Sequence, residues 1–187
     1  MTVGNEYGTG MMRTTLTAVP RRLTVLFGKA AVLTAVTLAA ATVAVLGSLL
    51  TGRLVEPGRG FTPDHGYAAL SLTDGPTLRA AAGSVLHLAL IGLLSLGLAL
   101  VVRNSATATG IVLALLFVFP ALAQMAADPD WQRHLQQVSP MTAGLAVQAT
   151  VGVDRLPVGP WQGPGVPALW AVAALTAGGR LLRARDA

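Results

Sequence analysis

The sequence contains no cysteine and few charged residues. Without cysteine, disulfides, thiolate metal sites and cysteine nucleophiles are excluded. Only 11% of the 187 residues are charged and 5% are aromatic, while 53% are hydrophobic; an ordinary soluble domain carries about 25% charged residues. Together with a mean hydropathy of +0.63, this composition is typical of a membrane protein.

The net charge of +5 arises from 13 Lys and Arg against 8 Asp and Glu. The basic residues are scattered between apolar segments and form no continuous patch, so we expect no nucleic-acid partner. In a membrane protein their distribution indicates topology instead.

Four apolar segments predict an all-α fold, a polytopic membrane helix bundle in contact with the lipid bilayer. The expected spans are residues 25–50, 80–102, 106–127 and 164–182, joined by outer loops at 51–79 and 128–163. The run from Ala30 to Leu50 is uncharged for 21 residues, which is enough to cross about 30 Å of hydrocarbon. Residues 25–187 are therefore expected to form a single transmembrane domain.

One further helix is expected outside the spans. Ser139 followed by Pro140 is typical of a helix start, with serine as the N-cap and proline in the first turn. The helix that follows, roughly 141–151, is too weakly apolar to span, so we expect it to lie on or dip into the outer surface. The preceding stretch DPDWQRHLQQ is predicted to be a polar loop in which Asp128 and Asp130 are solvated acids.

Two polar residues in the spans are candidate sites. His87 is the only ionisable residue of the second span, and Gln124 lies near the end of the third. Ionisable residues at membrane depth are functional candidates by default. Because neutral histidine is tolerated far better there than lysine or aspartate, an interhelical hydrogen bond is favoured over transport chemistry.

Small residues indicate where helices could approach closely. They fall on the second span at Gly83, Gly92 and Gly97, on the first at Ala31, Ala35 and Ala39, and on the third at Gly110 and Ala114. For the alanine ridge, a lipid-facing position is an equally good interpretation.

The charges also predict an orientation. With both termini in the cytoplasm, eight of the 13 basic residues are inside and six of the eight acids are outside, as the positive-inside rule requires. Trp131, Trp161 and Trp170 then fall on or near the outer side, where interfacial aromatic residues are common. We expect a multi-pass protein of a bacterial plasma membrane.

Motifs for catalysis are missing from the sequence. There is no phosphate-binding G-x-x-x-x-G-K-[ST] loop, and His65, His87 and His134 are isolated, without paired metal-ligand spacing. We therefore expect no enzyme activity, no metal site and no cofactor bound by this chain. PRRLTVL before an apolar run resembles a twin-arginine signal, but that run is too long and further spans follow.

The polar segment EYGTGMMRTTLTAVPRR, within residues 1–24, precedes the first span. Met12, Leu16 and Val19 recur at helical spacing, Arg13 lies beside them, and Pro20 ends the pattern. A short amphipathic helix is predicted, held by a partner or by a lipid surface. This segment resembles the cytoplasmic segment after the second membrane helix of bacterial ABC transporter permeases of the type-2 exporter class, particularly small alanine-rich ones of actinobacteria. VVRNSATATG, LALLFVFPALAQ, SPMTAGLAVQA and the basic ending LLRARDA agree with that resemblance.

The resemblance implies a permease subunit that forms a homodimer or heterodimer and pairs with a separate ABC ATPase subunit, which alone binds ATP. Carried onto this sequence, the coupling residues that would contact the ATPase are Glu6, Gly8, Thr9, Gly10, Arg13, Pro20 and Arg21. The alternative for this segment is an interfacial helix that anchors the first span.

The chain departs from the six-span pattern of the family, because the coupling segment begins five residues after Met1. We therefore expect the first two helices to be encoded upstream, or the chain to be an inactive truncated permease. Two different classes of protein also fit the sequence: a small four-span scaffold or assembly protein, and a secreted protein with a cleaved leader. The sequence does not identify the substrate or the direction of transport.

Overall fold

The structure, a computed structural model, describes residues 22–55 and 74–184. In these ranges the chain forms α-helices and short 3-10 helices and no strand. The elements in chain order are α3 (Arg22–Val55), α4 (Gly75–Val102), α5 (Ser105–Met125), α6 (Pro129–Val138), α7 (Pro140–Leu145), η3 (Ala146–Gln148), η4 (Val153–Arg155) and α8 (Gly165–Ala184). The expected all-α class is confirmed.

The first two membrane helices are longer than predicted. Residues 51–55 continue α3 and residues 75–79 open α4, whereas the sequence pattern predicts loop for both stretches. Helix α4 follows the N-cap residue Asp74 and has Pro76 in its first turn. Proline in the first turn forfeits no intrahelical hydrogen bond, and its fixed φ suits a helix. Pro76 therefore starts the helix instead of breaking it.

A tight turn reverses the chain between α4 and α5. Arg103 adopts a left-handed conformation with φ 58°, and its backbone N–H donates to the Ala99 carbonyl. The side chain of Asn104 then caps α5 by accepting from the backbone N–H of Thr107 at 3.1 Å. Helix α5 runs through Pro120 to Met125, close to the predicted 106–127.

The segment between α5 and α8, predicted as an outer loop, holds most of the unexpected structure. Residues 129–138 form α6, because Asp128 caps it by accepting from the Asp130 N–H at 2.9 Å and Pro129 occupies its first turn. The expected polar loop is thus an amphipathic helix. The next helix starts at Ser139 and Pro140 as predicted, but ends after α7 and η3 at Gln148.

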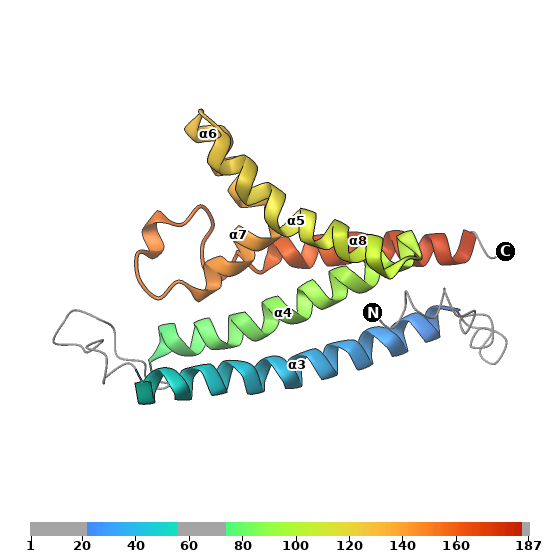
Figure 1. The fold of residues 1–187 in the computed structure, drawn as a ribbon, viewed down its shortest axis with the longest axis horizontal. Coiled ribbons are helices and arrows are strands. Elements are labelled where there is room, and N and C mark those ends of the chain that lie inside the picture. The colour runs from blue at the N-terminus through green and yellow to red at the C-terminus, as the bar shows by residue number, and fades with distance from the viewer. Residues whose placement is uncertain (1–21, 56–73, 185–187) are drawn as a thin grey trace.

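Helix α4 is the centre of the bundle. Both α3 and α8 pack along it, while α3 and α8 contact each other little. Figure 1 shows α3, α4 and α8 side by side, with α5 leaving the bundle obliquely and α6 at its far end. Helix α7 contacts α5 and α6 on one side and α8 on the other. Buried leucines, alanines and one valine of α4, η3 and α8 supply most of the core.

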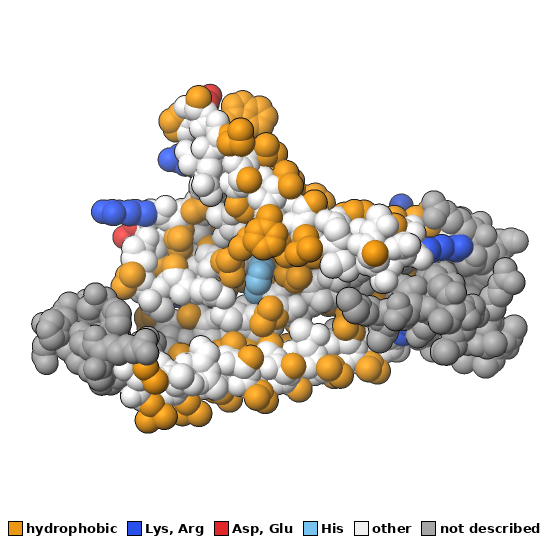
Figure 2. Space-filling model, in the orientation of Figure 1, with side chains coloured by type: hydrophobic (Ala, Val, Ile, Leu, Met, Phe, Trp, Pro, Cys, Tyr) orange, Lys and Arg blue, Asp and Glu red, His pale blue; other side chains and the backbone are white. Residues whose placement is uncertain are grey.

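Within residues 22–55 and 74–184, four helices are long and apolar enough to cross a membrane: Leu26–Val55, Gly75–Val102, Ser105–Met125 and Gly165–Leu182. Large apolar side chains on them are exposed, including Val43 at 73% and Leu54 at 82%. Figure 2 shows charged side chains at the two ends of the bundle and apolar ones between them. Such a surface is stable in lipid, and the chain is therefore a membrane protein.

Ser139 offers a first stability test. Its side chain is fully buried and accepts from the Thr142 N–H at 3.2 Å. We expect Ser139→Ala to lower the free energy of unfolding by about 1–2 kcal/mol, because a buried helix N-terminus loses its cap. Unfolding in mixed micelles measures it. Asn104→Ala, which removes an exposed cap, is the matched control and should cost about 0.5–1 kcal/mol. Equal losses at both positions would contradict a special role for the burial of Ser139.

Candidate functional site: the α4–α7–α8 junction

The predicted coupling residues Glu6, Gly8, Thr9, Gly10, Arg13, Pro20 and Arg21 lie outside the described residues. Their proposed contact with an ATPase remains a prediction. The described part contains both intramembrane candidates, His87 in α4 and Gln124 in α5.

The closest helix contact joins α4 to α8. A Cβ added at Gly97 would lie 2.6 Å from the backbone carbonyl carbon of Ala174, and one added at Gly178 would lie 2.8 Å from the Cβ of Leu100. The two helices therefore run parallel and approach to backbone contact. The expected role of Gly97 in close packing is confirmed, whereas Gly92 has only ordinary contacts, the nearest 3.5 Å from Thr37 Oγ1.

Helix α7 and η3 fill the space beside the first half of α4. Val147 of η3 lies directly on Gly83, and the imidazole of His87 lies directly on Gly144 of α7. Pro140, Ala143 and Val147 are fully buried. The segment expected to lie on or dip into the outer surface is thus packed into the protein, and its depth in the membrane stays a prediction.

Three side-chain hydrogen bonds to backbone carbonyls hold this inserted segment. Arg79 Nη2 of α4 donates to the Ala149 carbonyl at 2.6 Å, Trp170 Nε1 of α8 donates to the Val138 carbonyl at 3.1 Å, and Gln137 Nε2 donates to the Pro157 carbonyl at 3.0 Å. The carbonyls of Val138 and Ala149 lie at helix ends, where they otherwise lack partners, and Pro157 lies in the loop after η4. Sequence reasoning missed Arg79, whose position in the first turns of α4 was hidden by the loop prediction.

His87 is buried, and its Nδ1 makes no hydrogen bond within the described part of the chain. Its side chain is 7% exposed, and the buried Nδ1 has no partner among the described residues. The interhelical hydrogen bond expected for it is therefore not formed within this part of the chain. The ring packs on the backbone of α7 instead, where glycine leaves room for it.

The second intramembrane candidate lies in a different environment. Gln124 is exposed in the last turn of α5, while His87 is enclosed by α4 and α7. Among the described residues no group of three His, Cys, Asp or Glu could hold a metal ion. The junction thus offers one isolated imidazole in an apolar setting, which suits packing and a single proton-accepting atom, not paired acid and base chemistry.

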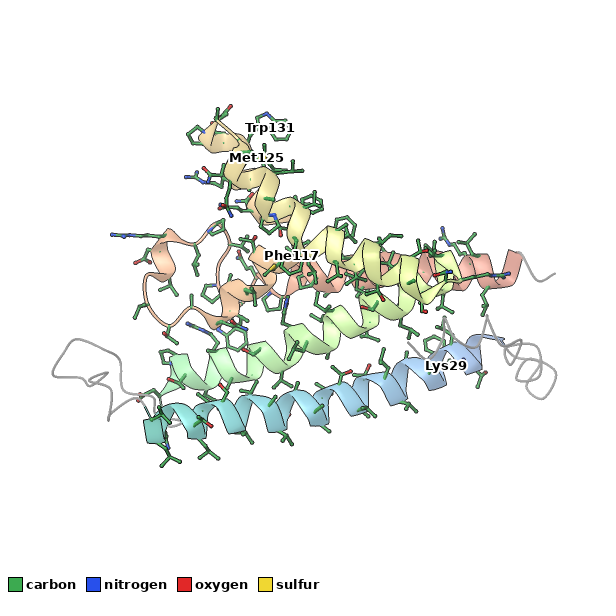
Figure 3. All side chains as sticks on the ribbon, viewed as in Figure 1. Lys29, Phe117, Met125 and Trp131 are labelled. Atoms are coloured by element: carbon green, nitrogen blue, oxygen red, sulfur yellow. The ribbon has the colours of Figure 1, made fainter. Side chains whose placement is uncertain are left out.

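The tryptophans separate into two kinds. Trp131 and Trp161 are exposed at 66% and 74%, as expected of interfacial anchors. Trp170 instead packs edge-on against Phe119 of α5, with ring centroids 6.2 Å apart. Figure 3 shows Trp131 and Met125 at the tip of the projecting α5 and α6, with Phe117 nearer the bundle. This tip exposes Met125 and Trp131 beside the charged residues Asp128, Asp130 and Arg133, and it projects away from the core.

The two ends of the bundle differ in charge. The end formed by the start of α3, the α4–α5 turn and the end of α8 carries Lys29, Arg103 and Arg180 and, among the described residues, no acid. The opposite end mixes the four described acids, Asp74, Asp128, Asp130 and Asp154, with Arg53, Arg79, Arg133 and Arg155.

Comparison of the chain with protein-family models, with curated proteins and with solved structures finds no match in any of the three.

Proposed function

We propose that this chain is a membrane-spanning permease subunit of an ATP-driven ABC transporter of the exporter class. A separate ATPase subunit binds and hydrolyses ATP, and this chain has no enzyme activity or cofactor of its own. The observation that carries the proposal is the segment EYGTGMMRTTLTAVPRR, which resembles the coupling segment of such permeases and directly precedes α3. The four membrane-length helices behind it support the same assignment.

The proposed orientation follows from the charges of the two ends. Basic residues are retained on the cytoplasmic side of membrane proteins, so we assign the all-basic end to the cytoplasm of a bacterium and the mixed end to the outside. The coupling segment enters α3 at the all-basic end, and the chain finishes there after α8. Both termini are then cytoplasmic, where an ATPase is accessible.

The unequal packing of the helices supplies a route for coupling. Helix α3 is a continuous helix of 34 residues. Only 6% of its most apolar stretch is buried by the rest of the protein. It contacts α4 but hardly touches α8, while α4 and α8 are joined at backbone distance. Motion imposed on residues 6–21 would therefore shift α3 against the α4–α8 pair. The exposed face of α3 is also available to a second permease subunit.

A binding experiment tests the coupling contact. We expect Glu6→Lys and Arg13→Glu each to weaken capture of the ATPase subunit encoded beside this chain by about tenfold or more, because a charged contact becomes repulsive. The measurement is a pull-down of the detergent-solubilised full chain, with the amount of bound ATPase quantified.

Charge reversals at the opposite end are the matched controls. Asp154→Lys and Arg155→Glu lie on the proposed outer side and should leave capture unchanged. Equal loss in all four variants would indicate a general charge effect and contradict the coupling role. Unchanged capture in all four variants would show that the segment does not contact the ATPase. If the native chain captures no ATPase, the alternative of a four-span scaffold protein is favoured.

A further inference from the structure

A groove opens between α3 and α8 at the all-basic end. The two helices both pack on α4 and contact each other little. The groove has a volume of about 330 Å³ and is lined by Leu26, Phe27 and Ala30 of α3 and by Leu175, Thr176 and Gly179 of α8, with Arg180 at its edge. Its volume falls within the range of about 300–1,000 Å³ found for ligand sites.

The floor of the groove is fixed by the core. Leu26 is buried in one cluster with Leu96, Leu100 and Leu182, and Ala30 and Leu175 pack against that cluster. Phe27 forms an exposed wall and is 69% accessible. The groove is thus a preformed apolar slot with an exposed wall at the surface of the bundle.

Arg180 places a positive charge beside this apolar slot. It is exposed, and among the described residues no ion pair or side-chain hydrogen bond holds its guanidinium. The described residues around this end include no acid that could neutralise it. Arginine near a helix end extends its apolar stem along the protein and leaves its charged group at the level of the lipid headgroups.

We propose that the groove binds one anionic phospholipid of the bilayer. One acyl chain occupies the slot between Phe27 and Thr176, and the headgroup phosphate accepts hydrogen bonds from Arg180. The apolar lining and an exposed guanidinium with no acidic partner in the described part of the chain match the two chemical halves of such a lipid. Basic pockets between membrane helices bind anionic headgroups in general. The inference goes beyond the proposed transport function and depends only on the bundle lying in a bilayer.

Competition between two lipids with identical acyl chains tests the proposal. The full chain is purified in detergent with equal phosphatidylglycerol and phosphatidylcholine, and the retained lipids are counted by native mass spectrometry. We expect native protein to retain phosphatidylglycerol in preference. Arg180→Gln should reduce that preference roughly fivefold, as expected for loss of one charge near anionic headgroups, whereas Arg180→Lys should preserve most of it.

Three further variants locate the site. Thr176→Trp, which fills the slot, should lower retention of both lipids, while Val172→Trp, one turn earlier on the exposed surface of α8, should not. Arg155→Gln removes a charge at the opposite end and should leave the preference within twofold. An unchanged preference in Arg180→Gln, or equal loss in Arg155→Gln, overturns the proposal. A dimer that Thr176→Trp dissociates without altering lipid retention would assign the groove to a second copy and also overturn it.

Discussion

Replacing Gly97 with valine should cost about 3 kcal/mol or more in the free energy of unfolding and separate α8 from α4. A Cβ at this position would lie 2.6 Å from both the Ala174 carbonyl carbon and the Leu175 nitrogen. Overpacking against side chains typically costs about 1–3 kcal/mol because they can move to another rotamer. Here the obstacles are backbone atoms of a helix, so the helices themselves must part. Unfolding in mixed micelles, followed by the near-ultraviolet circular dichroism of the tryptophans, measures the change.

Gly110→Val is the matched control for that substitution. Gly110 lies on α5, another membrane-length helix, and nothing approaches its added Cβ within 4 Å. The same change in side chain should therefore alter the free energy of unfolding by no more than about 0.5 kcal/mol. Similar losses at Gly97 and Gly110 would show that glycine matters for helix flexibility and not for the contact between α4 and α8.

The comparison of these two glycines shows what the sequence could predict. Small residues stand out on three helices, but the sequence does not say which face of a helix meets a neighbour. Gly97 lies against the backbone of α8 and Gly83 against the side chain of Val147. In contrast, Ala31, Ala35 and Ala39 are exposed on α3, and Gly110 and Ala114 are exposed on α5. In lipid no difference in polarity separates a packed face from an exposed one, so hydropathy cannot distinguish them.

The spans themselves are predictable because an uncharged run of about 20 residues has few other stable states. The ends of the spans are less predictable, because proline can either start or interrupt a helix. Pro140 is correctly predicted as a first-turn residue because Ser139 precedes it. Asp74 before Gly75-Pro76 and Asp128 before Pro129 repeat this sequence pattern, although only the Asp128 side chain makes a capping hydrogen bond. The charges around both residues nevertheless favour a loop. Applied consistently, the rule for Ser139 would have found α6 and the start of α4.

The junction around His87 lies beyond the sequence for a different reason. Its members come from α4, α7, η3 and α8, which are separated along the chain and meet only through tertiary packing. His87 is identifiable because an ionisable residue stands out in an apolar run. Gly144, on which the ring packs, and Arg79, which donates to the Ala149 carbonyl, have no local sequence feature that indicates these contacts. The sequence therefore indicates the polar atom but not the apolar surroundings that leave its Nδ1 without a partner among the described residues.

Because of these apolar surroundings, we expect His87→Leu and His87→Ala to have different effects on the free energy of unfolding. We expect His87→Ala to lower the free energy of unfolding by about 2–3 kcal/mol, since it leaves a cavity between α4 and Gly144 where the ring now packs. Leucine is apolar and can occupy much of the same space. His87→Leu should therefore change stability by less than about 1 kcal/mol, or raise it, because it removes a buried nitrogen that has no hydrogen-bond partner in the described part of the chain.

Unfolding in mixed micelles distinguishes a packing role for His87 from a polar one. The Leu variant restores shape without the ring nitrogens, so recovery of stability relative to Ala assigns the imidazole to packing. Gln124→Leu, at an exposed position of α5, controls for the general effect of adding apolar surface. Loss of more than about 1.5 kcal/mol in His87→Leu would mean that a ring nitrogen is hydrogen-bonded in the native protein. If His87→Leu keeps its stability but abolishes transport by the assembled complex, the imidazole acts in transport through its polar atoms.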